Sequence, residues 1–203
     1  MAMMLQGFQK AEKPRLFEEM FRLRKEVLFD QKGWDVKIVD GQFEIDEFDR
    51  DDTVYLLSLD ERGNLMAACR LLNTVYPHMM SGPFKPMFPD VDFQSPVIWE
   101  ATRWTARHGG KMQPNGVSYA SCDICLTAVH FGLQYGVEQF VAIFEAPMRR
   151  MYRKCGMSPK VLSTISEGAY RGISAGIWDV RPENEEQILR ATGLESSLIS
   201  AAA

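Results

Sequence analysis

The sequence of 203 residues contains no apolar run of the length that a membrane span requires. Its apolar start, Met1 to Leu5, is followed by the polar residues Gln6, Gln9 and Lys10, so it lacks the apolar core of a signal peptide. It also lacks an excess of basic residues, because its formal net charge is −4, and this argues against nucleic acid as the main partner. We therefore expect a cytoplasmic protein that binds neither a membrane nor nucleic acid.

Metal-ligating side chains are scarce. The three histidines, His78, His108 and His130, do not stand at ligand spacing. Among the four cysteines, Cys122 and Cys125 form one C-x-x-C motif, which could be a redox pair or half of a zinc site, but no second such motif exists. Thiols of a cytoplasmic protein are reduced. We therefore expect buried structural thiols and no metal site.

The sequence also has no glycine-rich phosphate loop, zinc-protease motif or nucleophile elbow. Disorder is excluded, since 46% of the residues are hydrophobic and 25% are charged, which is typical of a globular protein. We expect a single domain over 1–203, with a mobile N-terminal part over about 1–52 and a C-terminal tail over about 195–203. The chemistry must then come from charged side chains.

Apolar periodicity divides the chain into helices and strands. Helices are predicted over 14–29, 121–135, 147–155 and 183–197. Strands are predicted over 54–59, 65–72, around Glu100, over 139–144 and once or twice within 161–180. A polar connection over 30–52 and an irregular segment over 77–96 lie between them. This order predicts an α/β fold, a single α/β/α sandwich with a mixed central sheet.

The stretch Val97–Trp104 is an apolar run that contains Glu100 and Arg103. Its β-branched and aromatic residues favour a strand, and a buried charge in a strand needs a partner. In a regular strand Glu100 and Arg103 would point to opposite faces, so either a bulge brings them together or each has a separate partner. A structural ion pair is the simplest interpretation; a carboxyl whose pKa is shifted by burial is the other.

Other charges also lie among apolar residues. The acidic segment 43–52 contains phenylalanine and isoleucine, so it has side chains to bury. If this segment folds over the sheet, three acids and three arginines could form one network. The six residues are Arg24, Asp46, Asp49, Arg70, Glu100 and Arg103. Bordered by Trp34, Phe84 and Trp104, this network would suit a cationic or aromatic ligand.

These residues resemble the signature of a known family. The matching positions are Arg24, Gly33-Trp34, Glu44-Ile45-Asp46, Asp49, Arg70-Leu71-Leu72, Phe84, Ile98-Trp99-Glu100 and Arg103. In this order they resemble the LuxI-type acyl-homoserine-lactone synthases, the autoinducer synthases of quorum sensing, over about residues 20–105. The chain departs from the family pattern at Leu28, where phenylalanine is usual, and at Trp104, where phenylalanine is common.

The resemblance implies a fold similar to that of the N-acetyltransferases (GNAT) and a reaction that needs no prosthetic group. S-adenosylmethionine is the implied co-substrate, and the acyl donor is a thioester of acyl carrier protein or of CoA. The amine of S-adenosylmethionine attacks the thioester. The methionine carboxylate of S-adenosylmethionine then closes on the methionine side chain, which gives the lactone and releases methylthioadenosine. Because the attacking amine must be neutral, a base is required, with Glu100 as the first candidate and Glu44 as the second.

The resemblance also implies the residues that bind S-adenosylmethionine. These are Arg24, Trp34, Asp46, Phe84, Arg103 and Trp104. Either arginine would suit the carboxylate of the ligand, while Asp46 and the aromatic faces would suit its sulfonium and adenine. Asp49 and Arg70 are expected to support the network.

The acyl pocket is expected along 140–144, with Ala142 and Phe144 as lining residues. Synthases of 3-oxo signals tend to carry threonine where this chain has Phe144, so the resemblance implies an unsubstituted, branched or aromatic acyl group, unless Phe144 turns into the core. The helix over 147–155 carries a basic cluster, which is either a solvated face or a docking site for the donor. The cluster consists of Arg149, Arg150, Arg153 and Lys154.

Two other functions are considered. An ordinary N-acetyltransferase would use acetyl-CoA, but His108–Gly116 does not have the glycine spacing of its pyrophosphate loop. A non-catalytic relative would bind an acyl thioester or S-adenosylmethionine as a sensor. The presence of Glu100 and Asp46 together with the arginines argues against this second alternative.

Overall fold

A mixed sheet lies at the centre of the computed structural model, which describes residues 1–194. Within these residues seven strands form the sheet in the order β1-β4-β5-β6-β7-β9-β8. The strands are β1 (Ala2–Gln6), β4 (Val54–Leu59), β5 (Leu65–Asn73), β6 (Ile98–Ala106), β7 (Gln139–Phe144), β8 (Lys160–Thr164) and β9 (Ser174–Asp179). Neighbouring strands are antiparallel, except that β6 and β7 are parallel. The predicted mixed sheet is confirmed.

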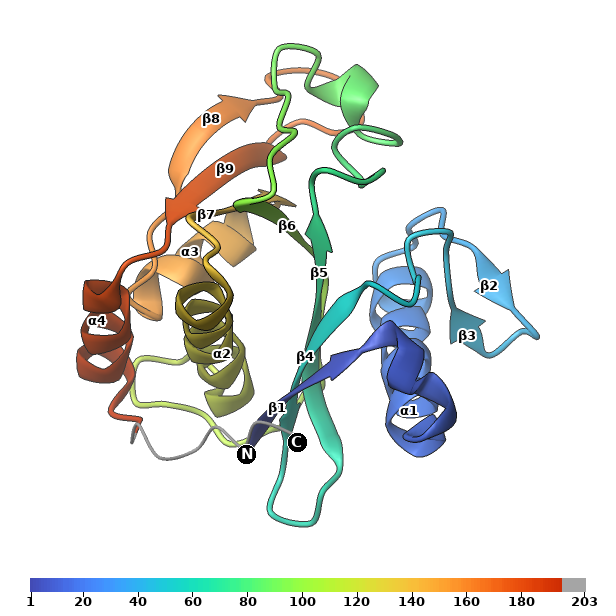
Figure 1. Ribbon diagram of the computed structural model, residues 1–203, viewed down its shortest axis with the longest axis vertical. Coiled ribbons are helices and arrows are strands. Elements are labelled where there is room, and N and C mark those ends of the chain that lie inside the picture. Colours follow the sequence, from blue (N-terminus) through green and yellow to red (C-terminus); the bar gives the residue numbers. More distant parts are fainter. Residues whose placement is uncertain (195–203) are drawn as a thin grey trace.

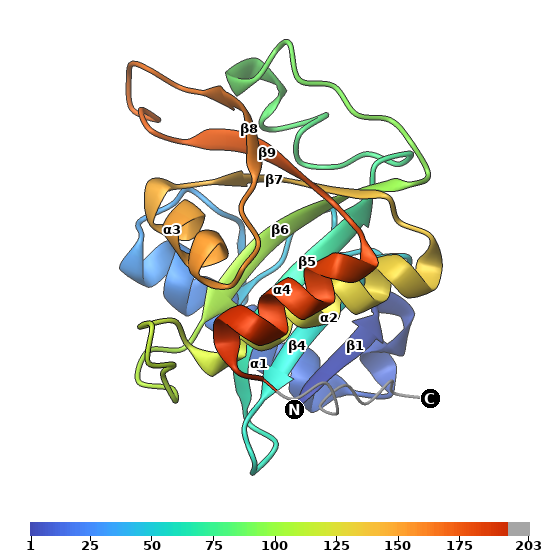
Figure 2. The same ribbon diagram turned by 90° about the vertical axis from the view of Figure 1, so that its left-hand side faces the viewer.

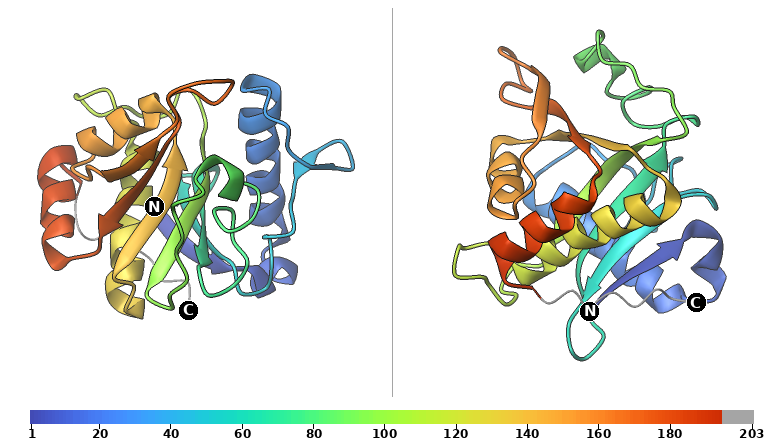
Figure 3. Two further views of the ribbon diagram at one scale, coloured as in Figure 1. Left: turned by 90° about the horizontal axis from the view of Figure 1, so that it is seen from above. Right: turned by 60° about the vertical axis from the view of Figure 1, so that its left-hand side comes forward.

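Helices cover both faces of the sheet (Figure 1). The helix α1 (Pro14–Arg24) lies on one face, and α2 (Tyr119–Tyr135), α3 (Ala146–Lys154) and α4 (Pro182–Thr192) lie on the other. Figure 2 shows α2 and α4 side by side over the strands, and the view from above in Figure 3 shows the sheet between the two helical layers. The arrangement is the predicted α/β/α sandwich.

The strand β4 shows why the sheet needs both layers. All its residues from Val54 to Leu59 are buried. Leu56 packs into the apolar core under α2, whereas Tyr55 and Leu57 pack into the core under α1. Because alternate side chains of a strand point to opposite faces, a strand buried on both faces reads as a continuous apolar run.

The strands β6 and β7 separate soon after they pair. They are joined only at Ile98–Gln139, Trp99–Phe140 and Glu100–Val141. Beyond Glu100, β6 continues beside β5 while β7 stays with β9, and Figure 2 shows the two strands diverging. A gap in the backbone pairing therefore begins directly after Glu100.

A bulge interrupts β6 just beyond that point. Ala68 pairs with Thr105 and Arg70 with Thr102, so β6 contains one more residue than β5 over this interval. Arg103 lies inside it and has a φ of 53°. Non-glycine residues adopt such values rarely and at a cost in strain.

The first fifty residues contain more regular structure than expected. The predicted helix 14–29 is α1 followed by a π-helical turn, η2 (Lys25–Gln31), and the predicted connection 30–52 contains a short ladder of β2 (Ile38–Val39) and β3 (Phe43–Glu44). The edge strand β1 was not predicted. Short 3₁₀ turns, η1 (Gly7–Ala11) and η3 (Lys85–Met87), complete the elements.

The C-terminal helix ends earlier than predicted. It stops at Thr192, because Gly193 adopts a left-handed conformation with a φ of 65°. The last three residues of the predicted helix 183–197, and the predicted tail over about 195–203, lie outside the described residues. The four cysteines are free and buried. Within 1–194 no helix combines the length and the apolar character needed to cross a membrane.

Candidate active site

Six charged side chains form a closed ring on the α1 face of the sheet. Each arginine bridges two carboxylates and each carboxylate bridges two arginines. In order around the ring they are Arg24, Glu44, Arg103, Asp46, Arg70 and Asp49. The formal charges cancel, so each buried charge is compensated by its neighbours.

The ring contacts have the lengths of charge-assisted hydrogen bonds. Arg103 Nε donates to Glu44 Oε1 at 2.9 Å, and Arg103 Nη2 donates to Asp46 Oδ2 at 2.8 Å. Arg70 donates to Asp46 at 3.0 Å through Nη2 and to Asp49 at 3.0 Å through Nη1. Arg24 Nη1 donates to Asp49 at 2.7 Å, and its Nε donates to Glu44, which closes the ring.

Several elements meet at this ring. Arg24 is the last residue of α1, Glu44 belongs to β3, and Arg70 and Arg103 belong to β5 and β6. Asp46 and Asp49 lie in the turn that follows β3. The ring therefore fastens α1 and the acidic segment to the sheet, as the sequence predicts.

One member of the predicted network is wrong. The sequence indicates Glu100 as the third acid, but Glu44 occupies that position in the ring. The reason is the register of the acidic segment: β3 ends at Glu44 and brings its carboxylate between Arg24 and Arg103. Sequence pattern alone does not reveal this, because Glu47 is even closer to Asp46 along the chain than Glu44 is.

Asp49 is the most enclosed carboxylate of the ring. Besides the two arginines, its oxygens accept hydrogen bonds from the Tyr55 hydroxyl at 2.9 Å and from the backbone N–H of Asp46 at 2.9 Å. Burial by itself would raise the pKa of Asp49, but the guanidinium groups of Arg24 and Arg70 outweigh it and hold the pKa below its usual range. Asp49 thus supports the ring.

Arg103 differs from the other two arginines. Every guanidinium nitrogen of Arg24 and Arg70 has a hydrogen-bond partner. Arg103 uses Nε and Nη2, while its Nη1 has no partner among residues 1–194. It is therefore the one arginine of the described ring with a nitrogen available to a ligand.

Glu100 lies outside the ring and has a different environment. Its side chain is fully buried and accepts backbone N–H bonds from Met79 at 2.7 Å and from Met80 at 3.0 Å. Burial raises the pKa of Glu100 to about 8. Of the two options from the sequence, the second is realised: a bulge is present, but Glu100 and Arg103 have separate partners. The amides of Met79 and Met80 were not predicted, because backbone donors leave no sequence signal.

The structure does not bring the three predicted aromatic residues together. Phe84 packs beside Phe48, and the aromatic ring of Phe48 lies 5.8 Å from the guanidinium carbon of Arg70. Phe84 therefore lies at the border of the ring of charges. Trp34 is 36% exposed, with Lys32 Nζ 5.1 Å from its ring. Trp104 packs into the core on the α2 face, away from the ring of charges.

The residues predicted for the acyl group and the donor lie on the α2 side. Ala142 and Phe144 are buried there, and the Phe144 ring presses against Gly176, where a Cβ would come within 2.8 Å of it. The basic cluster on α3 is exposed. A pocket of about 430 Å³ lies beside it, lined by Arg150 and Lys154 and by residues 106–110.

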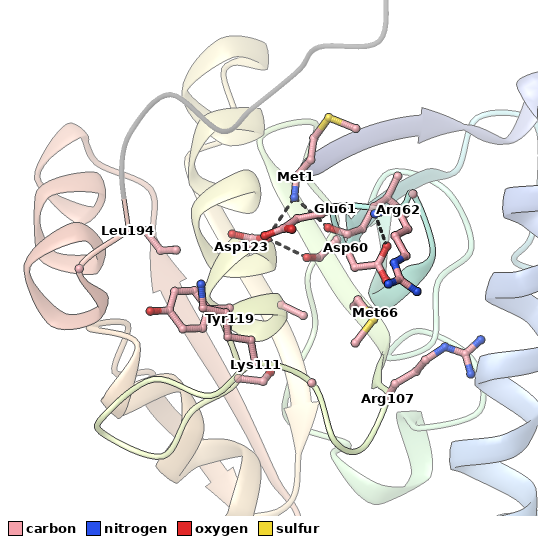
Figure 4. Close-up of a pocket in the computed structure, with 17 residues that line it drawn as sticks. Met1, Asp60, Glu61, Arg62, Met66, Arg107, Lys111, Tyr119, Asp123 and Leu194 are labelled. Atoms are coloured by element: carbon pink, nitrogen blue, oxygen red, sulfur yellow. Dashed lines mark hydrogen bonds and ion pairs between the residues drawn. The ribbon is translucent and has the colours of Figure 1, made fainter.

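A second pocket, of about 940 Å³, lies elsewhere (Figure 4). Its lining includes Asp60, Lys111, Tyr119 and Asp123, and the carboxylate of Asp123 accepts a hydrogen bond from Ser58 at 2.8 Å. It includes no residue of the ring and not Glu100. The proposed chemistry is therefore not placed in this pocket.

Known proteins match this chain over most of its length. The family model described as autoinducer synthase matches residues 8–188. An acyl-homoserine-lactone synthase of Rhizobium etli is 32% identical over 173 residues, which cover 84% of this chain and 80% of that protein. The resemblance drawn from the ring residues and Glu100 is confirmed.

Solved structures agree in fold. The structure of a CoA-dependent acyl-homoserine lactone synthase, BjaI, with SAM and isopentyl-CoA has a TM-score of 0.83 at 23% identity and covers 99% of this chain and 92% of that chain. A putative N-acetyltransferase from Lactobacillus plantarum has a TM-score of 0.57 at 14% identity and covers 89% and 99%. The expected similarity to the N-acetyltransferase fold is therefore confirmed.

Proposed function

The chain belongs to the autoinducer synthase family and is an acyl-homoserine-lactone synthase, and from this premise we propose which of its residues carry the reaction. The enzyme transfers an acyl group from a thioester to the amine of S-adenosylmethionine. Closure of the methionine carboxylate on its own side chain then gives the lactone and releases methylthioadenosine. The environment of Glu100 is the observation that supports our assignment of roles most directly.

Glu100 is the general base in this proposal. A base works best when its pKa is near the working pH, and burial brings the pKa of Glu100 to about 8. Two backbone N–H groups hold its carboxylate in place without a direct ion pair to a cation. Glu44 is less suitable, because both its oxygens are already bonded to guanidinium groups, those of Arg24 and Arg103.

Arg103 is the residue that we assign to the carboxylate of S-adenosylmethionine. Its Nη1 is free, whereas the nitrogens of Arg24 are all engaged. Phe84 at the border of the ring and the exposed Trp34 are assigned to the sulfonium and the adenine. Asp46 contributes negative charge near the sulfonium, while Asp49 and Arg70 keep the arginines in position.

The acyl donor is assigned to the α2 side of the gap between β6 and β7. Glu100 is the last residue of β6 paired with β7, so the thioester would meet the amine there, and the acyl chain would extend along Ala142 and Phe144. The exposed basic cluster on α3, beside the pocket of about 430 Å³, suits an acidic acyl carrier protein or the phosphates of CoA. The proposal further includes a cytoplasmic location and a mobile N-terminal part over about 1–52.

The test is direct. Purified protein is incubated with S-adenosylmethionine and a panel of acyl thioesters, each carried on CoA and on acyl carrier protein, and the products are identified by mass spectrometry. Equal amounts of lactone and methylthioadenosine are expected. An acylated amine without methylthioadenosine would instead indicate an ordinary N-acyltransferase, and binding without turnover would indicate a sensor.

A further inference from the structure

The segment between β5 and β6 presents two consecutive backbone N–H groups to Glu100. Met79 donates to Oε2 at 2.7 Å and Met80 donates to Oε1 at 3.0 Å, so each oxygen of the carboxylate receives one bond. Within residues 1–194 the carboxylate has no other hydrogen-bond partner. The direction of these two N–H groups therefore decides how the proposed base is held.

Each of the two N–H groups shares a rigid peptide plane with a carbonyl group. A trans peptide unit is planar, and its C=O and N–H point in opposite directions. The N–H of Met79 lies in one plane with the carbonyl of His78, and the N–H of Met80 lies in one plane with the carbonyl of Met79. Whatever binds these two carbonyls also orients the two donors to Glu100.

The two carbonyls are bound from within the same turn. The His78 oxygen accepts hydrogen bonds from Ser81 Oγ at 3.0 Å and from the Gly82 N–H at 3.1 Å. The Met79 oxygen accepts one from the Phe84 N–H at 2.9 Å. Ser81 supplies the one side chain among these donors, and its hydroxyl also accepts the N–H of His78 at 3.1 Å. Ser81 thus binds both the N–H and the C=O of His78 and closes the turn.

The side chain of His78 holds the start of the turn. It is 2% exposed, and its Nδ1 lies 2.9 Å from the carbonyl oxygen of Tyr76. Because a carbonyl oxygen only accepts, Nδ1 carries the proton and Nε2 is an acceptor. Nε2 is buried and has no partner among the described residues, so a protonated ring would bury a second N–H without an acceptor. Burial accordingly lowers the pKa of His78, and the ring is neutral with a single N–H bound to Tyr76.

We propose that Ser81 and His78 are positioning residues for the general base, because they hold the turn over 76–82 in the geometry that aims two N–H groups at Glu100. The proposal rests on the proposed function, since it takes Glu100 as the base. Both side chains act through the backbone and touch no substrate. A purely structural role would alter stability alone, whereas a positioning role also alters the proton affinity of Glu100.

The proton affinity of Glu100 reports on this geometry. Burial raises the pKa of Glu100 to about 8, while the N–H bonds from Met79 and Met80 and the charges of Arg70 and Arg103 limit the rise. If the two bonds weaken while burial and the arginines stay the same, the pKa rises further. The loss of about one such bond corresponds to an upward shift of about half a pH unit to one unit.

Ser81→Ala removes the hydroxyl from an exposed position, so the fold is not at risk. The pH midpoint at which kcat rises should move upward by about half a unit to one unit. At pH 7 kcat should be roughly three- to tenfold lower, and at pH 9.5 it should be within about twofold of wild type. Initial rates of methylthioadenosine release measure both effects. Ser81→Thr keeps the hydroxyl and should restore the wild-type midpoint, and Ser166→Ala, at another exposed serine, is the control.

A second pair of variants addresses the imidazole. Asparagine can place a side-chain N–H near the position of Nδ1, whereas leucine has no donor. His78→Leu should therefore shift the midpoint upward as Ser81→Ala does, and His78→Asn should shift it less. The melting temperature of each variant is recorded, so that a loss of folded protein is not mistaken for a change in the base.

Carbon-13 NMR of the Glu100 carboxyl in the free enzyme, assigned by its loss in Glu100→Gln, measures the same pKa without turnover. An unchanged pKa in either Ser81→Ala or His78→Leu overturns the proposal, even if the melting temperature falls. A shift that Ser81→Thr does not reverse overturns it as well. Absence of lactone with every donor, or full turnover by Glu100→Gln, would instead reject the proposed function, so the two failures can be told apart.

Discussion

Glu100 is a buried carboxylate whose partners are backbone amides rather than a cation. Its raised pKa of about 8 has two consequences of opposite sign. The stability that the protonated carboxyl contributes is present below the ordinary pKa of 4.5 and is lost as the pH rises through about 8. The basic form that accepts a proton from the amine, however, becomes populated as the pH rises through about 8.

The substitution Glu100→Gln should leave the fold intact and lower kcat by roughly 10²–10⁴-fold, since the amide cannot accept the proton. The wild-type rate should rise with pH up to about 8, and this rise should disappear in the variant. Steady-state kinetics across the pH range measures both effects. Glu47→Gln, at an exposed glutamate, is the control and should behave like wild type. Turnover within a few-fold of wild type in Glu100→Gln would transfer the role of base to Glu44 or to water.

At the scale of residues, the sequence predicts types of partner better than their identities. The need of Arg24, Arg70 and Arg103 for acids follows from their apolar neighbours, and the ring provides those acids. The sequence could not predict that Glu44 rather than Glu100 is the third acid of the ring, because this depends on the register of the two-residue strand β3. The hydrogen-bond donors to Glu100 are the backbone N–H groups of Met79 and Met80, and almost any residue at these positions could supply them.

The ring acts at the scale of elements, because it joins α1 and the acidic turn to β5 and β6. Asp49→Ala leaves Arg24 and Arg70 buried with fewer partners, and it should lower the free energy of unfolding by about 3–5 kcal/mol. Urea denaturation measures this loss. Glu186→Ala removes an exposed ion pair with Arg190 and should cost about 0.5 kcal/mol or less. An equal loss of unfolding free energy in the two variants would mean that the ring is hydrated and does not stabilise the packing of α1 and the acidic turn on the sheet.

Three polar bridges connect the π-helical turn η2 and its end to the far side of the site. Glu26 lies 3.5 Å from Arg107, Gln31 lies 3.1 Å from His108, and Lys32 pairs with Glu145 at the start of α3. All three are at least partly exposed, so each is individually weak. Movement of η2 would have to break them, whereas movement of the whole N-terminal part would also have to break the ring and the pairing of β1 with β4.

Lys32→Glu should therefore accelerate hydrogen exchange over 25–37 by about fivefold or less, because an exposed pair contributes up to about 1 kcal/mol. Exchange followed by mass spectrometry gives the rate for each segment. Lys37→Glu reverses an exposed charge nearby and serves as the control. If both variants exchange like wild type, the bridge between Lys32 and Glu145 does not restrain this segment.

Elements with a clear apolar period were predicted well, and β4 and β7 have the predicted bounds. The edge strand β1 was missed because Ala2–Gln6 does not alternate, and its structure depends on pairing with the distant β4. The turn η2 was read as a continuation of α1, since π and α helices place apolar residues at similar spacing.

Charge is unevenly distributed over the whole molecule. The chain has a formal net charge of −4, yet the nine residues of α3 carry four basic side chains and no acidic one. A local field of this sign attracts an acidic partner at low salt even when the protein as a whole is acidic. The position of α3 beside the pocket of about 430 Å³ directs that attraction to the proposed donor site.

Reversal of Arg150 and Arg153 to glutamate should raise the KM for the acyl donor roughly tenfold at low salt and leave the KM for S-adenosylmethionine unchanged. The effect should shrink as salt is added, because exposed charges are screened. Reversal of Arg62 and Arg171, which are also exposed, is the control of equal charge and should alter neither constant. If the α3 variant leaves both KM values unchanged, the basic face of α3 is only a solvated surface and does not bind the donor.

The short pairing between β6 and β7 also bears on how the chain reaches its folded state. On either side of it lie antiparallel groups of strands, β1-β4-β5-β6 and β7-β9-β8. Parallel pairing requires a long crossover and forms slowly, so we expect the two groups to form first and to join last. Glu100 is the final residue of that join, and enzymatic activity should therefore return after secondary structure during refolding from urea. Simultaneous recovery of activity and of the far-UV signal would contradict this order of assembly.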